Sequence, residues 1–245
     1  MGAAALVSGG KDSIYSAYLC ETQGWPVDEL VVIEPADPES PLYHTPNLGM
    51  VDLQAKAWGR TVRRVRASPG GPEAEAAALD EAIRGPHDPI VAGAIASSFQ
   101  WARLVAATYR AGKRLFVPLW GKAARTVVEE EIAAGLDIRL VHLSAEPLGA
   151  ELLGARLDAP LLRRLDALSR TVRAFHLAGE GGEFETLVVD APFFRERIVL
   201  DEVEARFDRS THTLGVRAAH LAPKSFPPVR DTGETAFGRG GSPPP

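Results

Sequence analysis

A glycine-rich segment near the start of the chain combines residue types that bind phosphate. It directly follows the apolar run Ala3–Val7 and reads Ser8, Gly9, Gly10, Lys11, Asp12 and Ser13. A strand that ends in such a turn and opens a helix presents unpaired backbone N–H groups to an anion, and glycines let the backbone approach it closely. Two hydroxyl groups add donors, and a lysine adds a positive charge. The sequence therefore predicts a phosphate-binding loop here.

The spacing of this loop excludes two common nucleotide-binding motifs. The mononucleotide P-loop has four residues between its first glycine and its Gly-Lys pair, and the dinucleotide motif reads G-x-G-x-x-G. Neither fits the direct succession Gly9, Gly10, Lys11. A glycine turn before a helix, without a ligand, explains the same residues in purely structural terms.

A second segment carries three glycines and three carboxylates within eight residues. It reads Gly179, Glu180, Gly181, Gly182, Glu183, Phe184, Glu185 and Thr186. Carboxylates this close repel one another unless cations or N–H donors lie nearby, so the segment does not form a core element. It could hold Mg²⁺, orient a cationic substrate group or accept a proton. A solvated acidic loop explains the residues equally well.

Further candidate residues follow predicted strands or lie in loops. They are Gly93, Ser97, Gln100, Arg103, Trp120, His44 and Asn47. Gly93 permits the close approach of a nucleotide, and Arg103 could reach a phosphate in fork geometry. The structural alternatives are a helix capped by Ser97, a packed Trp120 and a helix cap at Asn47.

Composition narrows the class of protein. The chain has 245 residues, a formal net charge of −5 and one cysteine, Cys20. A single cysteine excludes an intramolecular disulfide and a cysteine-based zinc cluster, and the negative charge argues against stable nucleic-acid binding. No apolar run approaches about 18 residues, so we expect no membrane segment. We expect a cytoplasmic protein, because the first strand begins too early for a signal peptide.

Short apolar runs alternate with helical patterns over the first two-thirds of the chain. The predicted strands are Ala3–Val7, Glu29–Ile33, Thr61–Val65, Pro89–Ala92, Arg114–Val117 and Ile138–His142. The predicted helices are Ser13–Gln23, Leu48–Trp58, Glu73–Arg84, Phe99–Ala111 and Ala124–Ala134. Such alternation predicts an α/β fold of the Rossmann-like kind, with a mainly parallel sheet flanked by helices. The acidic run Glu129–Glu131 is interpreted as a solvated helix face.

The pattern changes after about Leu148. A charged helical stretch, Pro160–Val172, is followed by the acidic loop and by β-like segments at Leu187–Val189, Arg197–Leu200 and Thr213–Ala219. This order predicts a smaller C-terminal α+β lobe. We therefore divide the chain into an α/β domain at 1–147 that carries the phosphate-binding loop, a smaller lobe at 148–222 that carries the acidic loop, and a tail at 223–245. Pro, Gly and Ser dominate the tail, which we expect to be disordered.

The phosphate-binding loop resembles the PP-loop of the ATP pyrophosphatases. The resemblance implies a PP-loop fold, which is a HUP-like α/β fold. In that superfamily the loop holds pyrophosphate while ATP is cut between its α and β phosphates. The other motifs, in this order, resemble one family within it, the diphthine–ammonia ligases. The discriminating segments are His44–Asn47, Gly93–Arg103, Pro118–Trp120 and Gly179–Phe193. The resemblance runs from about Ala3 to Leu221, although Ser98 stands where the family pattern has an acidic residue.

This resemblance implies a reaction, its cofactors and its partners. The carboxylate of diphthine, a modified histidine of translation elongation factor 2, would attack the α phosphate of ATP in the presence of Mg²⁺. Ammonia, supplied as free ammonium, would then displace AMP to leave diphthamide.

The resemblance also implies roles for residues. Ser8, Gly9, Gly10 and Ser13 would hold pyrophosphate, Lys11 would neutralise developing charge, and Asp12 would serve Mg²⁺ or the geometry of the loop. Gly93 and Arg103 would lie along the nucleotide. The implied catalytic residues are Lys11, Asp12, Glu183 and Glu185. The implied substrate-binding residues are His44, Asn47, Ser97, Gln100, Trp120, Glu180, Gly181, Gly182, Glu183, Glu185 and Thr186.

Two other classes of function stay open on the residues alone. One is a PP-loop ligase that acts on another carboxylate or on tRNA, and the other is a non-catalytic nucleotide-binding regulator. The oligomeric state is also open, a homodimer included.

Overall fold

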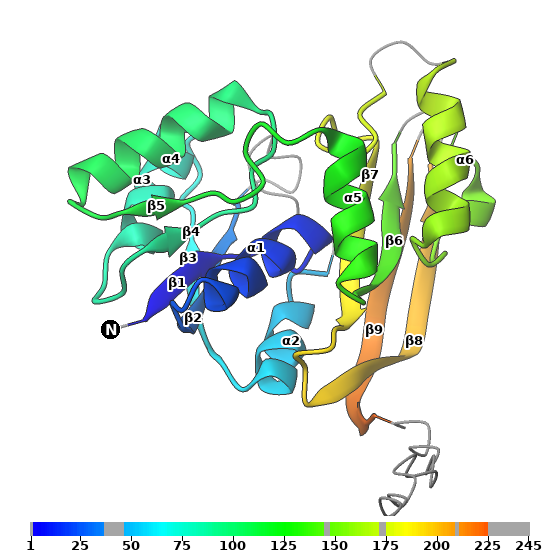
Figure 1. Ribbon diagram of the computed structural model, residues 1–245, viewed down its shortest axis with the longest axis horizontal. Helices are drawn as coiled ribbons and strands as arrows, with labels where there is room; N and C mark the ends of the chain where they lie inside the picture. The colour runs from blue at the N-terminus through cyan, green and yellow to red at the C-terminus, as the bar shows by residue number, and fades with distance from the viewer. Residues whose placement is uncertain (1, 37–46, 145–147, 172–174, 209–210, 225–245) are drawn as a thin grey trace, which may run out of the picture.

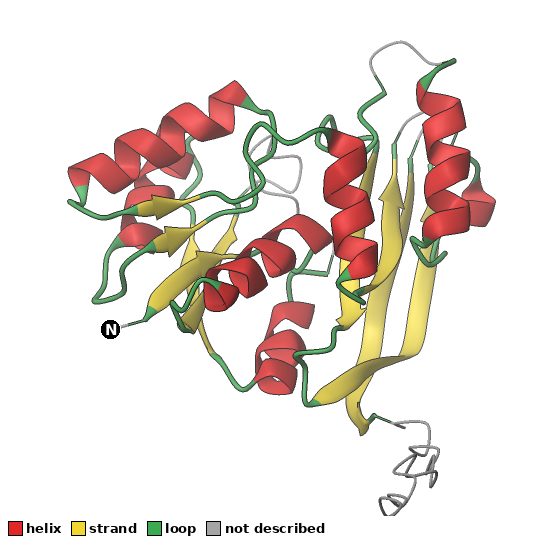
Figure 2. Cartoon of the chain, viewed as in Figure 1, coloured by secondary structure: helices red, strands yellow, loops and turns green. Residues whose placement is uncertain are grey.

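The structure is a computed structural model, and it describes residues 2–36, 47–144, 148–171, 175–208 and 211–224. Its strands form one parallel and one antiparallel sheet, which lie side by side with helices around them (Figure 1). Figure 2 shows the same arrangement by type of secondary structure. The N-terminal half of the chain builds the parallel sheet, and the C-terminal half builds the antiparallel one.

The first sheet has five parallel strands in the order β3-β2-β1-β4-β5, which confirms the predicted α/β class. Its strands are β1 (Ala3–Leu6), β2 (Val27–Glu34), β3 (Thr61–Arg66), β4 (Ile90–Val91) and β5 (Leu115–Phe116). The helices that flank it are α1 (Lys11–Thr22), α2 (Met50–Trp58), α3 (Pro72–Ile83) and α4 (Ser98–Arg110).

Helices cover both faces of this sheet, because alternate residues of its strands point to opposite sides. Ala3 and Ala5 of β1 join the apolar cluster that contains α1 and α2. Ala4 joins a second cluster, built with α3 and α4. The near-continuous apolar runs of β1 and β2 follow from this burial on both sides.

The strand order places a switch point at the centre of the sheet. From β1 the chain first adds β2 and β3 on one side, and later adds β4 and β5 on the other. Ligands of open α/β sheets bind beyond the carboxyl ends of the strands at such a point. The predicted phosphate-binding loop directly follows β1, and Gly93 directly follows β4. Both therefore lie where the fold favours a ligand.

The second sheet is antiparallel in the order β7-β6-β9-β8. Its strands are β6 (Asp137–Leu143), β7 (Phe184–Asp190), β8 (Glu196–Phe207) and β9 (His212–Pro223). Figure 1 shows α5 and α6 in front of it. The helical elements of this part are α5 (Ala124–Ala133), the short 3₁₀ helix η1 (Ala150–Leu152) and α6 (Ala159–Ser169). One apolar cluster runs from β1 through α1 and α5 into β6 and β7, so the two sheets share a core.

One predicted strand lies in the other sheet. The segment Ile138–His142 was expected to extend the parallel sheet, but β6 pairs antiparallel with β7 and β9. Its local pattern is that of any buried strand after a helix, and only the partner strands, far along the chain, decide which sheet it joins. The division of the chain at residues 147 and 148 stays a prediction.

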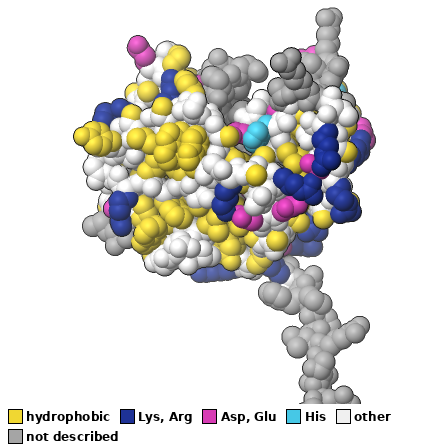
Figure 3. Space-filling view, turned by 45° about the horizontal axis from the view of Figure 1, so that its top comes forward, with side chains coloured by type: hydrophobic (Ala, Val, Ile, Leu, Met, Phe, Trp, Pro, Cys, Tyr) yellow, Lys and Arg dark blue, Asp and Glu magenta, His cyan; other side chains and the backbone are white. Residues whose placement is uncertain are grey.

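No helix in the described part of the chain is long and apolar enough to cross a membrane. On the face shown in Figure 3, basic and acidic side chains lie interspersed, while hydrophobic side chains gather mainly on its left half. The expected tail falls mostly outside the described residues, since β9 ends at Pro223 and the description ends at residue 224.

Candidate functional site

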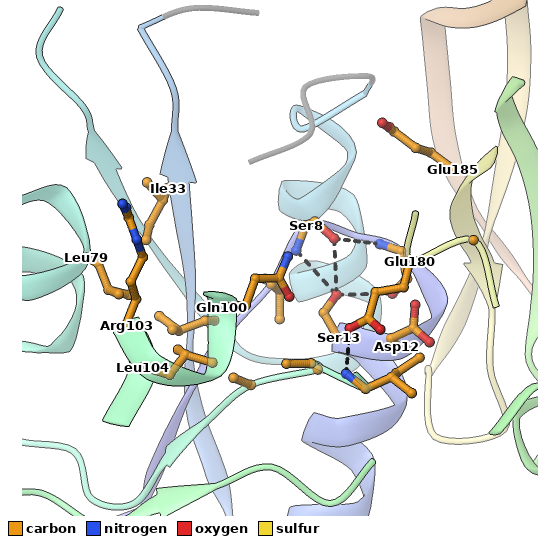
Figure 4. Close-up of a pocket in the computed structure, with 18 of the residues that line it drawn as sticks. Ser8, Asp12, Ser13, Ile33, Leu79, Gln100, Arg103, Leu104, Glu180 and Glu185 are labelled. Carbon is orange, nitrogen blue, oxygen red and sulfur yellow. Dashed lines mark hydrogen bonds between the residues drawn. The ribbon is translucent and has the colours of Figure 1, made fainter. Parts of the chain in front are cut away.

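A cavity of about 250 Å³ lies at the switch point, where the ends of β1, β2 and β4 face the start of β7 (Figure 4). Residues of both predicted motifs, which are far apart in the chain, line this one cavity. The predicted residues on its wall are Ser8, Gly10, Asp12, Ser13, Gly93, Gln100, Arg103, Glu180, Glu185 and Thr186. The other predicted residues that the structure describes do not line this cavity.

The phosphate-binding loop folds around the hydroxyl group of Ser13. Its Oγ donates to the carbonyl of Gly10 at 3.1 Å and accepts the N–H of Ser8 at 3.3 Å. Gly9 has a φ of 86°, a left-handed conformation that glycine adopts without strain. Helix α1 then begins at Lys11 without a side-chain cap from Gly10. The N-terminus of a helix on a cavity wall is a binding position for an anion.

Strand β7 fixes this loop from the other side. The N–H of Lys11 donates to Thr186 Oγ1 at 3.1 Å, and the N–H of Val188 donates to the carbonyl of Gly9 at 3.0 Å. A Cβ atom on Gly10 would lie 3.2 Å from Thr186 Oγ1, so the close approach of the two segments favours glycine at this position. The loop and the acidic segment are thus joined directly.

Gln54 of α2 is a loop-holding residue that sequence reasoning missed. Its Nε2 donates to the carbonyls of Gly9 at 2.9 Å and of Val188 at 2.7 Å, and the residue is fully buried. A signal for it exists in the sequence. Gln54 stands at helical spacing among the buried residues Val51, Ala55 and Trp58, where a polar side chain needs a partner.

Lys11 points away from the cavity wall into the interior. It is 1 % exposed, and its Nζ lies 2.6 Å from Asp12 Oδ1 and 3.5 Å from Glu131 Oε2. Burial acts to lower the pKa of Lys11, but the carboxyl groups of Asp12 and Glu131 outweigh it and raise the pKa above its ordinary value. Lys11 is therefore a stable cation whose nearest anion is Asp12.

The prediction that residues 129–131 form a solvated helix face is wrong for Glu131. It has no exposed surface, and burial raises its pKa well above the ordinary value by more than the neighbouring Lys11 lowers it. The buried residues of α5 are Val127, Val128 and Glu131, which share one helical face. Glu131 lies at helical spacing from the two valines, so periodicity predicts that it is buried, although glutamate as a residue type does not.

Glu180 joins the acidic loop to the segment that follows β4. Its carboxylate accepts the N–H groups of Ile95 at 2.8 Å, of Ala96 at 2.7 Å and of Ser97 at 3.3 Å. Three successive N–H groups at the start of α4 form an anion-binding arrangement, and here a side chain of the protein occupies it. Glu180 also lies on the cavity wall, beside Asp12 and Ser13 in Figure 4.

The other two acidic side chains of the loop point in different directions. Glu183 is 7 % exposed and turns into its own loop, where it accepts the N–H groups of His176 at 2.6 Å and of Gly181 at 3.0 Å. Glu185 belongs to β7 and lies on the cavity wall. Gly182, with a φ of 84°, supplies the turn between Glu180 and Glu183, while Gly181 is exposed.

The segment after β4 contributes three of the predicted wall residues, Gly93, Gln100 and Arg103. A Cβ atom on Gly93 would lie 2.8 Å from the backbone nitrogen of Ser13, so α1 itself already requires glycine at this position. Ser97 caps α4 by accepting the N–H of Gln100 at 3.3 Å. Arg103 lies beside Ile33 and Leu79 in Figure 4, on the side of Gln100 away from Ser8. Its guanidinium stacks over the ring of Phe99 at 4.1 Å.

Trp120 and Asn47 lie off the cavity wall. Trp120 stacks on Trp101 at 4.5 Å between ring centroids. A helix cap was the structural alternative for Asn47, but its amide donates to the carbonyl of Leu214 at 2.8 Å and accepts the N–H of Val216 at 2.7 Å, so its side chain binds the backbone of β9. The remaining candidate, His44, lies outside the described residues.

The sequence was compared with those of known protein families. The profile of the diphthamide synthase N-terminal domain matches residues 1–115, and that of the diphthamide synthase C-terminal domain matches residues 124–221. Together they span both sheets and both motifs of the cavity. The chain belongs to the diphthamide synthase family.

Three curated relatives of this chain are named diphthine–ammonia ligase. A diphthine–ammonia ligase from Rattus norvegicus is 29 % identical over 231 residues, which cover 84 % of this chain and 85 % of that protein. The Homo sapiens protein of the same name is 29 % identical over 83 % of this chain and 84 % of its own length. The match to the Schizosaccharomyces pombe protein, at 28 % identity, covers 81 % of this chain and 36 % of that longer protein.

A solved structure also overlaps with part of the chain. It is described as a predicted subunit of tRNA methyltransferase from Methanocaldococcus jannaschii, with a TM-score of 0.40 and 16 % sequence identity. The overlap covers 61 % of this chain and 81 % of that one. Similarity at this level bears on neither fold nor function.

The cavity of this family member presents oxygen ligands of a kind that suits Mg²⁺ carried by a nucleotide. Among the described residues, no group of three or more His, Cys, Asp or Glu side chains is arranged to hold a metal ion by itself. Mg²⁺ in nucleotide-using enzymes needs only one or two carboxylates, because phosphate oxygens and water complete its shell. Asp12, 28 % exposed at its side chain and next to Ser13, is a carboxylate on the cavity wall that could serve as such a ligand.

Proposed function

We propose that this chain amidates diphthine on translation elongation factor 2, using ATP and ammonia and releasing AMP and pyrophosphate. Membership of the diphthamide synthase family and the names of its relatives support an ATP-dependent ligase of diphthamide biosynthesis. The observation that carries the proposal is the meeting of the phosphate-binding loop and the acidic loop at one cavity. Because the acceptor is a translation factor, we expect the protein to act in the cytoplasm.

The reaction needs activation because a carboxylate is a poor acyl donor. The carboxylate oxygen of diphthine attacks the α phosphorus of ATP, the bond to the bridging oxygen breaks, and pyrophosphate leaves with that electron pair. Ammonia then attacks the acyl carbon, the bond to AMP breaks, and the nitrogen loses a proton to leave the amide. The protein contributes positioning and charge stabilisation to both displacements.

The nucleotide side of the site consists of the residues around α1. Ser8, Ser13 and the N-terminus of α1 would bind the leaving pyrophosphate, since hydroxyl and backbone N–H groups face the cavity there. Asp12 would hold Mg²⁺, which neutralises phosphate charge when bound. Lys11 would act through Asp12, because its ammonium group contacts that carboxylate and lies off the wall.

The acceptor side of the site consists of the acidic loop. Diphthine carries a quaternary ammonium group, and Glu185 places a carboxylate on the cavity wall that would attract it or take a proton from ammonia. Glu183, by contrast, would support catalysis by holding the loop, since two backbone N–H groups occupy its oxygens. Gln100 and Thr186 complete the wall between the two sides.

A labelling experiment tests this function directly. The purified protein would be incubated with diphthine-bearing elongation factor, ATP and Mg²⁺, with either ¹⁴N- or ¹⁵N-ammonium as the nitrogen source. We expect modified factor whose mass differs by about 1 Da between the two arms, together with AMP in equal amount. Release of ADP would contradict the proposal, as would efficient use of glutamine in place of ammonium. Absence of AMP with every acceptor would favour a nucleotide-binding regulator.

The bridge made by Glu180 leads to a further prediction. Changing Glu180 to Gln replaces an acceptor of three N–H groups by an amide with one acceptor oxygen, so the acidic loop loses its fixed position. We expect kcat/KM for the elongation factor to fall about 10- to 100-fold, while KM for ATP changes less than about threefold. Steady-state kinetics against each substrate would check this, with the exposed Glu202→Gln as the control. Equal losses for both substrates would refute the bridging role.

A further inference from the structure

The end of the cavity away from the phosphate-binding loop is apolar. In Figure 4, Ile33, Leu79 and Leu104 lie on the far side of Gln100 from Ser8 and Ser13. Val31 of β2 and Ala92, which follows β4, extend the same wall. A cavity with phosphate donors at one end and apolar side chains at the other suits a nucleotide whose base occupies the apolar end.

Glu75 stands out on this wall because it is charged and buried. It lies in the first turn of α3, is 8 % exposed, and lines the cavity together with Ala76 and Leu79 of the same helix. A carboxylate in apolar surroundings costs free energy unless hydrogen-bond donors compensate for the lost water. Glu75 has partners within the protein, but a carboxylate offers about four acceptor positions and accepts from several donors at once.

The other polar side chains near the apolar end, Arg103 and Gln100, differ from Glu75 in their contacts or in their position. Arg103 stacks over Phe99 and donates through Nη1 to the carbonyl of Pro72 at 3.4 Å, at the N-terminal end of the same helix. Gln100 lies between the two ends of the cavity in Figure 4. Glu75 is thus the acceptor-only group placed among the apolar residues.

We infer that Glu75 recognises the nucleotide base by accepting a hydrogen bond from the exocyclic amino group of adenine. This inference rests on the proposed use of ATP and adds the residue that selects it. A base with a carbonyl at that position would set one acceptor against another inside the cavity, and a base with hydrogen there would leave the carboxylate without its donor. Sites built to bind a donor reject analogues that lack it, because the buried acceptor is left unpaired.

Nucleotide binding in the absence of acceptor and ammonium tests the inference. Calorimetry of the full chain would compare ATP with purine riboside triphosphate, which lacks only the 6-amino group, and with GTP. We expect the wild-type protein to bind ATP at least about tenfold more tightly than purine riboside triphosphate. Glu75→Met should reduce that ratio to within about twofold, and Glu75→Gln, which keeps a carbonyl acceptor, should retain part of it. Glu73→Gln, exposed on the same turn of α3, is the matched control and should behave as wild type.

The outcomes separate this inference from the proposed function. If the wild-type protein binds no ATP, the proposed function fails and the inference fails with it. If ATP binds and folded Glu75→Met or Glu75→Ala keeps the tenfold preference, only the inference is overturned. Tighter binding of GTP than of ATP would also overturn it, since guanine can donate to a carboxylate through N1–H and its 2-amino group. Thermal unfolding of each variant shows whether it is folded. Two different replacements of Glu75 are used so that a folding defect in one of them does not prevent the test.

Discussion

Asp12→Asn is expected to lower the rate of AMP formation at least about 100-fold. The carboxylate of Asp12 lies on the cavity wall beside Ser13, where the phosphates of ATP would meet the N-terminus of α1. An asparagine of the same size keeps the shape of the loop but removes the negative charge that a magnesium ion needs. Adding Mg²⁺ should restore part of the activity, because a weakened metal site fills at higher concentration. AMP release would be measured over a range of Mg²⁺ concentrations.

Two controls make this result specific to the metal. Asp12 also binds Lys11 at 2.6 Å, so thermal unfolding of Asp12→Asn must be measured to separate lost folding from lost chemistry. Glu73→Gln removes a carboxylate from an exposed position and should leave the rate unchanged. A folded Asp12→Asn protein with a rate within about threefold of wild type would rule out this role of Asp12.

The fold was predictable because its signals are local. Apolar runs of four to eight residues separated by amphipathic helices define a parallel sheet, and the bounds of β1 and β3 agree with those predicted to within one residue. The long hairpin of β8 and β9 was predicted too short. Most residues of β8 from Asp201 to Phe207 are exposed, and the segment contains the acidic residues Asp201, Glu202 and Glu204, a residue type that is depleted in strands.

The two halves of the site were predictable, but the direction of each side chain was not. The sequence shows three carboxylates in the acidic loop without showing that Gly179 and Gly182 both adopt positive φ. Those turns send Glu180 to the start of α4 and fold Glu183 back onto its own loop. Glu75 and Gln54 escaped notice because each is one polar residue in an apolar pattern, and only its surroundings show why it is there.

Lys11→Met is expected to lower the free energy of unfolding by about 3 kcal/mol. The variant keeps the length of the side chain but removes the cation between Asp12 and Glu131. Asp12 is partly solvated, whereas Glu131 is fully buried and loses its only charged neighbour of opposite sign among the described residues. Part of the cost is relieved because Glu131 can take up a proton, which its raised pKa already favours. Urea unfolding followed by circular dichroism would measure the change.

Lys11→Met combined with Glu131→Leu distinguishes two roles for the lysine. The double variant replaces a buried charge pair by apolar groups, so at least half of the lost stability should return, and the cycle of single and double variants gives the coupling between the side chains. If the ammonium group acts on pyrophosphate, as the family resemblance implies, this stable double variant should still bind ATP poorly. The position of Nζ off the cavity wall predicts the opposite, that its affinity for ATP measured without Mg²⁺ stays within about threefold of wild type. A double variant that is stable yet loses ATP binding would therefore show that Lys11 acts on the phosphates. A double variant that binds ATP but forms AMP slowly would show that Lys11 orients Asp12.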